Sequence, residues 1–323
     1  MARPLVCILG TGDWPETNRA VASARRFGLG VAVGVSGEQA RGTPHPDARR
    51  YPVEWRDDFA DARNQLAERV TADGLPGDYL LWLDSDEELM AYPEDDPGFE
   101  GPCAAALITD HTDLTPRAIR RLQRRAPLES WVNAIHETLP SGGVDPPIVA
   151  AIAIRHHGYD DPARVAAKQQ RNARIVARER AAGRDYFTLA LEEARAATGG
   201  EAFMAWLRAF NHAKAAPSAP GRFDARYEPA AALCAFDYRK PALKVLAANP
   251  RIVELQLAVL LSEYADGGAI DEKRLAFVAE LLATGGNDPR YFFPRALAGA
   301  DRAGVLAWLD ERCAPGNGTE TGT

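Results

Sequence analysis

The sequence lacks the features that mark several classes of protein. Its four cysteines, Cys7, Cys103, Cys234 and Cys313, include no CxxC pair, so neither a zinc site nor a disulfide framework is expected. The net charge is −7, whereas nucleic-acid binding needs a basic face. No apolar run approaches the ~20 residues of a membrane span, and the first apolar run is too short for a signal peptide. These absences predict a cytoplasmic protein with no nucleic-acid partner and no transmembrane segment.

What the sequence does contain is an ordinary globular composition, with 46% apolar and 26% charged residues. Its 323 residues suit two domains. Apolar periodicity and Gly/Pro breaks predict a strand–helix–strand–strand–helix–strand order, which is typical of a doubly wound α/β domain. The expected segments are strands at 4–10, 30–35, 51–55 (an edge strand) and 79–83, with helices at 15–27 and 56–71; further strands are expected at 104–109 and 148–154.

Beyond residue 161 the strand patterns stop and short helical patterns alternate with Gly/Pro breaks. The expected helices cover 164–182, 187–197, 201–213, 228–236, 241–248, 251–264, 272–284 and 294–311. Pairs of helices of this length suggest helical hairpins, although no clean 34-residue repeat is present. We therefore expect an α/β domain over 1–160, an all-α domain over 161–315 and a disordered tail over 316–323.

The most informative stretch is YLLWLDSDEE, residues 79–88. Its apolar half predicts a strand buried on both faces, and its acids should end that strand at the rim of the sheet, where α/β proteins bind ligands. Asp84 and Asp86 are two residues apart and point the same way in an extended segment. Hard oxygen ligands of this kind suit Mg²⁺ or Mn²⁺, and hence a diphosphate; a solvated acidic loop is the alternative.

Three weaker signals accompany the acids. The turn Gly10-Thr11-Gly12 before a helix is either a plain tight turn or a phosphate cradle. Arg117 to Arg125 contains five arginines, which are either a solvated face or the cationic partner of a phosphorylated ligand. His156, at the exit of the expected strand 148–154, is either structural, a metal ligand or a base.

Four patches together give a family resemblance. They are WRDDFADARN (55–64), YLLWLDSDEE (79–88), WVNAIHE (131–137) and IRHHGY (154–159), the last followed by Lys168 and by Arg171-Asn172. Their order and spacing resemble those of glycosyltransferase family 2-like proteins, in which a GT-A-type nucleotide-sugar domain precedes a helical, often tetratricopeptide-like, extension. The resemblance covers about a third of the chain.

The resemblance implies a metal-dependent, inverting sugar transfer. Asp84 and Asp86 would hold Mn²⁺ or Mg²⁺ on the donor diphosphate, with His156 as a third ligand or a diphosphate contact. Glu137, or His136 in its place, would be the general base. Arg63 and Ser85 would contact the donor nucleotide. The turn residues Thr11, Gly12 and Asp13, together with Ser36 after the second strand, would complete the donor site.

Two family segments are missing from this chain. The usual D-T-G-S-x-D-x-T after the second strand is replaced by VGVSGEQ (33–39), and the usual N-E after the first strand by Gly12-Asp13-Trp14. Either Asp13 or Glu38 takes their place, or the donor differs from the common UDP-sugars, or turnover has been lost. The expected partners are a nucleotide sugar, a small-molecule, saccharide or peptide acceptor, and a second copy bound through the helical domain. A non-catalytic binding or scaffold module is the alternative function, and a nucleotidyl or phosphoryl transferase is a third.

Overall fold

The computed structural model describes residues 3–10, 14–36, 43–95, 97–110, 116–141, 145–157, 162–213, 225–265 and 271–283. The chain divides into two compact units, Met1–Leu189 and Ala190–Thr323. The predicted boundary at residue 160 precedes helix α3 (Pro162–Ala181), which the structure groups with the first unit. The reason is that Ile175 of this helix is buried against Ala134 and Ile135 of that unit.

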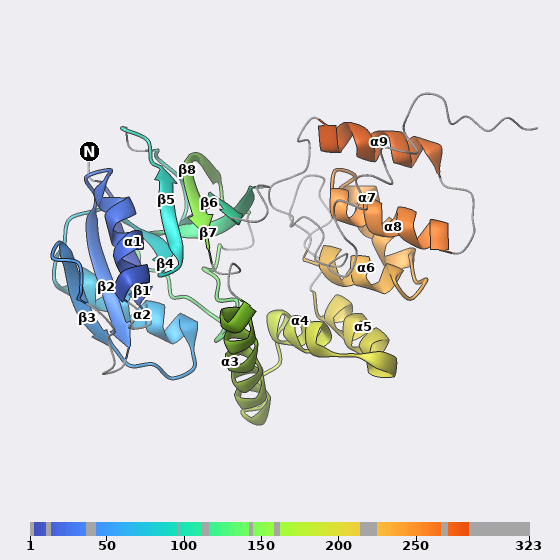
Figure 1. The fold of residues 1–323 in the computed structure, drawn as a ribbon, viewed down its shortest axis with the longest axis horizontal. Helices are drawn as coiled ribbons and strands as arrows, with labels where there is room; N and C mark the ends of the chain where they lie inside the picture. Colours follow the sequence, from blue (N-terminus) through green and yellow to red (C-terminus); the bar gives the residue numbers. More distant parts are fainter. Residues whose placement is uncertain are drawn as a thin grey trace, which may run out of the picture. The chain divides into compact units, whose positions relative to one another are not determined.

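The first unit is built on a mixed eight-stranded sheet (Figure 1). Its strand order is β3-β2-β1-β4-β7-β6-β8-β5. Strands β1 to β4 pair in parallel, as do β6 and β8, whereas β4 with β7, β6 with β7 and β5 with β8 are antiparallel. The strands are β1 (Leu5–Gly10), β2 (Gly30–Ser36), β3 (Ala48–Val53), β4 (Tyr79–Asp84), β5 (Glu87–Ala91), β6 (Cys103–Asp110), β7 (Arg117–Arg124) and β8 (Ile148–His156).

The two faces of the sheet carry separate apolar cores, one under each helix. Alternate residues of a strand point to opposite faces, so Ile8 of β1 packs in the core that contains α1 (Trp14–Arg25), while Cys7 packs in the core that contains α2 (Phe59–Ala72). Figure 1 shows these helices beside the β1–β4 part of the sheet. Strand order reverses between β1 and β4, and the crevice at the carboxyl ends of such strands is the usual ligand position in α/β sheets.

The predicted order of the first six elements is confirmed, and so is the edge position of β3. The predicted strand does end at the first acid, Asp84, but the expectation that the acids after it lie at the rim is wrong for Glu87. The chain turns through Ser85 and Asp86 and enters β5, which runs antiparallel to β8. Glu87 in this strand is 2% exposed. Burial of this carboxylate is possible because it has a charged partner, Arg121.

The described part of the second unit is helical, as predicted. Its elements are α4 (Phe187–Ala196, which begins in the first unit), a 3-10 turn (Gly199–Glu201), α5 (Ala202–His212), α6 (Tyr227–Cys234), α7 (Lys240–Ala248), α8 (Val253–Ala265) and α9 (Glu272–Ala283). Helices α6, α7 and α8 share one apolar cluster. Arg195 and Glu228 form a bidentate pair with both N–O distances at 2.8 Å. The predicted helix 294–311 and tail 316–323 lie outside the described residues. Among the helices that are described, none is long and apolar enough to cross a membrane.

Candidate functional site

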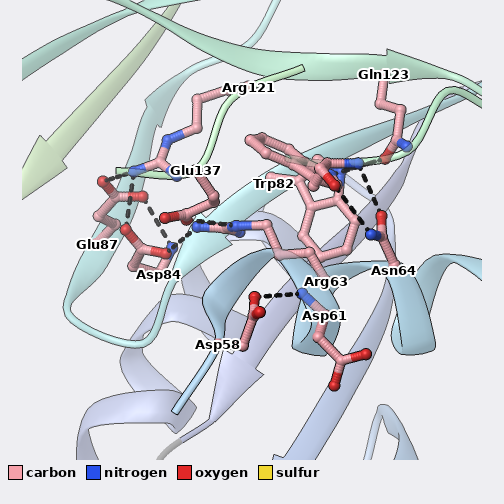
Figure 2. Close-up of polar contacts among 11 residues, drawn as sticks. Asp58, Asp61, Arg63, Asn64, Trp82, Asp84, Glu87, Arg121, Gln123 and Glu137 are labelled. Atoms are coloured by element: carbon pink, nitrogen blue, oxygen red, sulfur yellow. Dashed lines mark hydrogen bonds and ion pairs between the residues drawn. The ribbon is translucent and has the colours of Figure 1, made fainter. Parts of the chain in front are cut away.

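Charged side chains from α2, β4, β5, β7 and the loop that carries Glu137 meet where β4 ends (Figure 2). Side chains from the β4–β5 turn, from β8 and from α3 join them. The carboxylates are those of Asp84, Asp86, Glu87 and Glu137, which we call the acid cluster. The cations that touch it are Arg63 of α2, Arg121 of β7, Lys168 of α3 and, when protonated, His156 of β8. The structure brings together five residues that were predicted separately from the sequence: Asp84, Asp86, His156, Glu137 and Arg63.

Both carboxylate oxygens of Asp84 are held by guanidinium groups. Oδ1 accepts from Arg63 Nη2 at 2.7 Å, and Oδ2 accepts from Arg121 Nη2 at 2.8 Å. Burial alone would raise the pKa of the Asp84 carboxyl, but these two cations hold it well below its usual range. The side chain of Asp84 is still 37% exposed. Asp84 is therefore an ionised group that remains open to solvent on one side.

Arg63 is almost fully buried, at 1% exposure. Its guanidinium lies against the rings of Trp82 and Trp131, 5.1 and 4.8 Å from their centroids, and its Nε donates to Glu137 Oε1 at 2.8 Å. This position differs from the prediction that Arg63 faces the nucleotide. The structure instead shows Arg63 aligning Asp84 and Glu137, with buried Nη1 lacking a partner among the described residues.

The aromatic cage of Arg63 is fixed by its own hydrogen bonds. Both indole N–H groups, of Trp82 and Trp131, donate to Gln123 Oε1, at 2.8 and 3.3 Å. Asn64, next to Arg63 on α2, bonds the Trp131 backbone twice, through Oδ1 at 2.8 Å and Nδ2 at 3.0 Å. The cage therefore ties α2 to the segment that carries Glu137.

Glu137 lies on a closed loop. Val132 and Thr138 exchange two backbone hydrogen bonds, each of 3.0 Å, and the residues between them turn back on themselves. Asn133 and His136 adopt left-handed backbone with φ of 74° and 49°, which is unfavourable for residues other than glycine. The turn leaves His136 exposed and directs the Glu137 carboxylate into the cluster. Oε2 of Glu137 makes no hydrogen bond to the described residues, so one oxygen can accept a proton.

Asp86 has a different set of partners. Its Oδ2 lies 2.7 Å from Lys168 Nζ and 3.4 Å from His156 Nε2. The pairing of Glu87 with His156 across β5 and β8 brings His156 to this position. Burial raises the pKa of Asp86, but the hydrogen bond with His156 and the nearby cations lower it to about 2. Burial lowers the pKa of His156, and Asp86 raises it above its usual value.

Three residues of the site, Glu87, Arg121 and Lys168, were not among the site residues predicted from the sequence. Glu87 Oε2 accepts the backbone N–H of Asp84 at 2.8 Å, and its Oε1 accepts from Arg121 at 2.5 Å. Burial raises the pKa of Glu87 despite Arg121. Three of the other four predicted arginines bond backbone carbonyls of this chain: Arg120 bonds Leu139, Arg124 bonds Phe99, and Arg125 bonds Val70, Leu75 and Gly77. For Glu87 and Arg121, the signal available in the sequence was that each charged residue interrupts an alternation of apolar residues.

The predicted donor residues on the first turn, Thr11, Gly12 and Asp13, lie outside the described residues, as does Glu38. Ser36 ends β2 and its Oγ lies 3.5 Å from the carbonyl oxygen of Gly10 at the end of β1. Ser85 is buried in the turn between β4 and β5. Gly10, Ser36 and Ser85 therefore lie at the carboxyl ends of three adjacent parallel strands.

The residues fit a divalent cation only in part. Asp86 and His156 are neighbours, and Mg²⁺ or Mn²⁺ on a substrate phosphate needs only one or two protein carboxylates. Asp84 does not fit this role as arranged, because both oxygens are paired with arginines. Within the described ranges no group of three or more His, Cys, Asp or Glu side chains is placed to hold a metal.

Comparison of the chain with protein-family models and with curated proteins finds no match. The geometry of the cluster is therefore the basis for assigning a function.

Proposed function

We propose that the first unit is a GT-A-type sugar transferase that takes a nucleoside-diphosphate sugar, most simply a UDP-sugar, as donor. One observation carries the proposal: the four carboxylates of the acid cluster converge with His156 at the carboxyl end of β4, beside the reversal of strand order. That position suits a phosphate-bearing ligand. The four-patch resemblance supplies the reaction class.

In this mechanism Glu137 is the general base. Arg63 holds its Oε1, so that Oε2 faces the acceptor and takes the proton from an acceptor hydroxyl or thiol as the latter attacks the anomeric carbon. A single base and direct displacement give inversion. Asp86 and His156 would hold the divalent cation, which, when bound, offsets the negative charge on the departing diphosphate. Arg63 and Arg121 orient Asp84, whose exposed side then faces the donor.

The proposal is tested by the product formed and by one substitution. Sugar transfer releases a nucleoside diphosphate, whereas nucleotidyl or phosphoryl transfer releases pyrophosphate or phosphate. Glu137→Gln is expected to bind donor normally and to lower turnover by ~10²-fold or more, the size of effect that a positioned base has. Wild-type turnover in Glu137→Gln would exclude Glu137 as the base and point to His136.

A non-catalytic binding module is the second candidate, and the pairing of both Asp84 oxygens with arginines favours it. Calorimetry with nucleoside diphosphates separates the two functions. The transferase predicts binding that Mn²⁺ strengthens and that Asp86→Ala weakens. A binding module predicts indifference to both the ion and the substitution.

A further inference from the structure

Helix α3 presents one face to the acid cluster. Lys168, Arg171 and Ile175 are spaced i, i+3 and i+7, which places them along one side of a helix. Lys168 contacts Asp86 at 2.7 Å, and Ile175 is fully buried against the segment just before Glu137. Arg171 lies between these two anchored residues, so its side chain also faces the cluster.

Arg171 differs from the other cations of the site in its partners. Among the described residues, no carboxylate oxygen lies within ion-pair distance of its guanidinium, and its buried Nε has no hydrogen-bond partner. It does contact the ring of Phe59, with the guanidinium carbon 4.7 Å from the centroid. Phe59 in turn packs edge-on against Trp55, at 4.9 Å between centroids. The guanidinium therefore packs against an aromatic ring, while no hydrogen bond to another described residue uses its donors.

The electrostatic surroundings of Arg171 also point to a ligand. Burial lowers the pKa of Arg171, while Asp84, Asp86 and Glu137 act on it from a distance in the opposite direction. A buried guanidinium Nε–H without an acceptor is unfavourable, because it has lost water and gained no partner. An oxyanion that enters the site would supply that acceptor, and the planar guanidinium matches a phosphate group with two parallel hydrogen bonds.

We propose that Arg171 binds a phosphate of the donor diphosphate, and that it does so without a divalent cation. Lys168, about 5–6 Å away between Cβ atoms at this spacing, adds positive charge on the same side. This inference rests on the proposed function, because it takes the diphosphate donor as the ligand. It adds a phosphate contact from α3 to the site at the ends of the strands.

The experiment is calorimetric titration of the full chain in EDTA with UDP, GDP and inorganic pyrophosphate, and with uridine as a phosphate-free probe. Arg171→Ala is expected to weaken binding of the phosphate-bearing probes by about 10- to 100-fold, the value of hydrogen bonds to a charged group. Arg171→Lys should recover part of this loss, since it keeps the charge without the fork. Arg174→Ala, which removes an exposed arginine of the same helix, should change nothing.

The outcomes separate this inference from the proposed function. Equal affinity of wild type and Arg171→Ala overturns the inference alone, as does binding that appears only with Mn²⁺ and depends on Asp86. Failure of every phosphate-bearing probe to bind, with or without Mn²⁺, overturns both. If Arg171→Ala weakened uridine binding as much as it weakens binding of the phosphate-bearing probes, the inference would also be overturned, because Arg171 would then not contact phosphate. Thermal unfolding of each variant shows whether the protein is folded at the temperature of the titration, and therefore whether a loss of binding reflects a loss of folding.

Discussion

Replacing Arg63 with methionine tests whether the caged guanidinium organises the site. The change keeps an unbranched apolar stem between the two indoles but removes the charge. It removes the ion-pair partner of Glu137, whose side chain is 14% exposed, and it removes one of the two arginines that hold Asp84, leaving Arg121. Removing one partner of a buried ion pair typically costs about 3–5 kcal/mol of folding free energy. The partial exposure of Asp84 allows water to replace one bond, so we expect the lower end, about 3 kcal/mol.

The assay is urea unfolding of the full chain followed by tryptophan fluorescence, because Trp82 and Trp131 contact the altered side chain. Arg56→Met is the matched control, since Arg56 pairs with Glu54 on the surface, where the two side chains are 57% and 67% exposed, and such pairs contribute little. Asp84→Asn should cost less than Arg63→Met, because Arg63 keeps Glu137 and its aromatic contacts. Equal midpoints for Arg63→Met and Arg56→Met would refute the reasoning.

Two further predictions concern other contacts of the site, those of Asp86 and of Gln123. Asp86→Asn should lower the pKa of His156, measured by NMR. It should also destabilise the protein more at pH 6 than at pH 8.5, because the stability that a raised histidine pKa provides is full below about pH 6.5 and is lost as the pH rises through the pKa of the folded state. An unchanged pKa of His156 would contradict its contact with Asp86. Gln123→Leu should cost about 2 kcal/mol in urea unfolding, since it leaves two buried indole N–H groups without an acceptor, whereas an unchanged midpoint would contradict that bonding pattern.

The order of the first six strands and helices could be predicted from the sequence because apolar period and Gly/Pro punctuation are local signals. Strands β5 and β7 were not predicted, because charged residues interrupt their apolar patterns. Helix α2 was predicted over 56–71 but begins at Phe59, where the side chain of Asp58 accepts the backbone N–H of Asp61 as an N-cap. The partners of the acids were not predictable in this way. Arg121 reaches Asp84 only because β7 inserts beside β4 in antiparallel pairing, and that pairing joins segments some forty residues apart in sequence.

The site residues show the same division. Asp84, Asp86, Glu137 and His156 could be selected because each follows an apolar run or lies in a recognisable patch. The role of Arg63 could not, since its burial depends on Trp131 folding over it from a distant segment. The available cue was that Trp82 and Trp131 each lie close in sequence to one of the acids.

The short turn between β4 and β5 constrains the number of residues between the acids. Only Ser85 and Asp86 separate the two strands, and each strand is locked to a different neighbour. A single inserted residue would shift the register of β5 by one residue. Such a shift moves every side chain of the strand to the opposite face of the sheet. Glu87 would then leave Arg121, and Asp86 would leave His156. The length of the β4–β5 turn therefore fixes the positions of the acids, and we expect insertions and deletions in this turn to be tolerated far less well than substitutions.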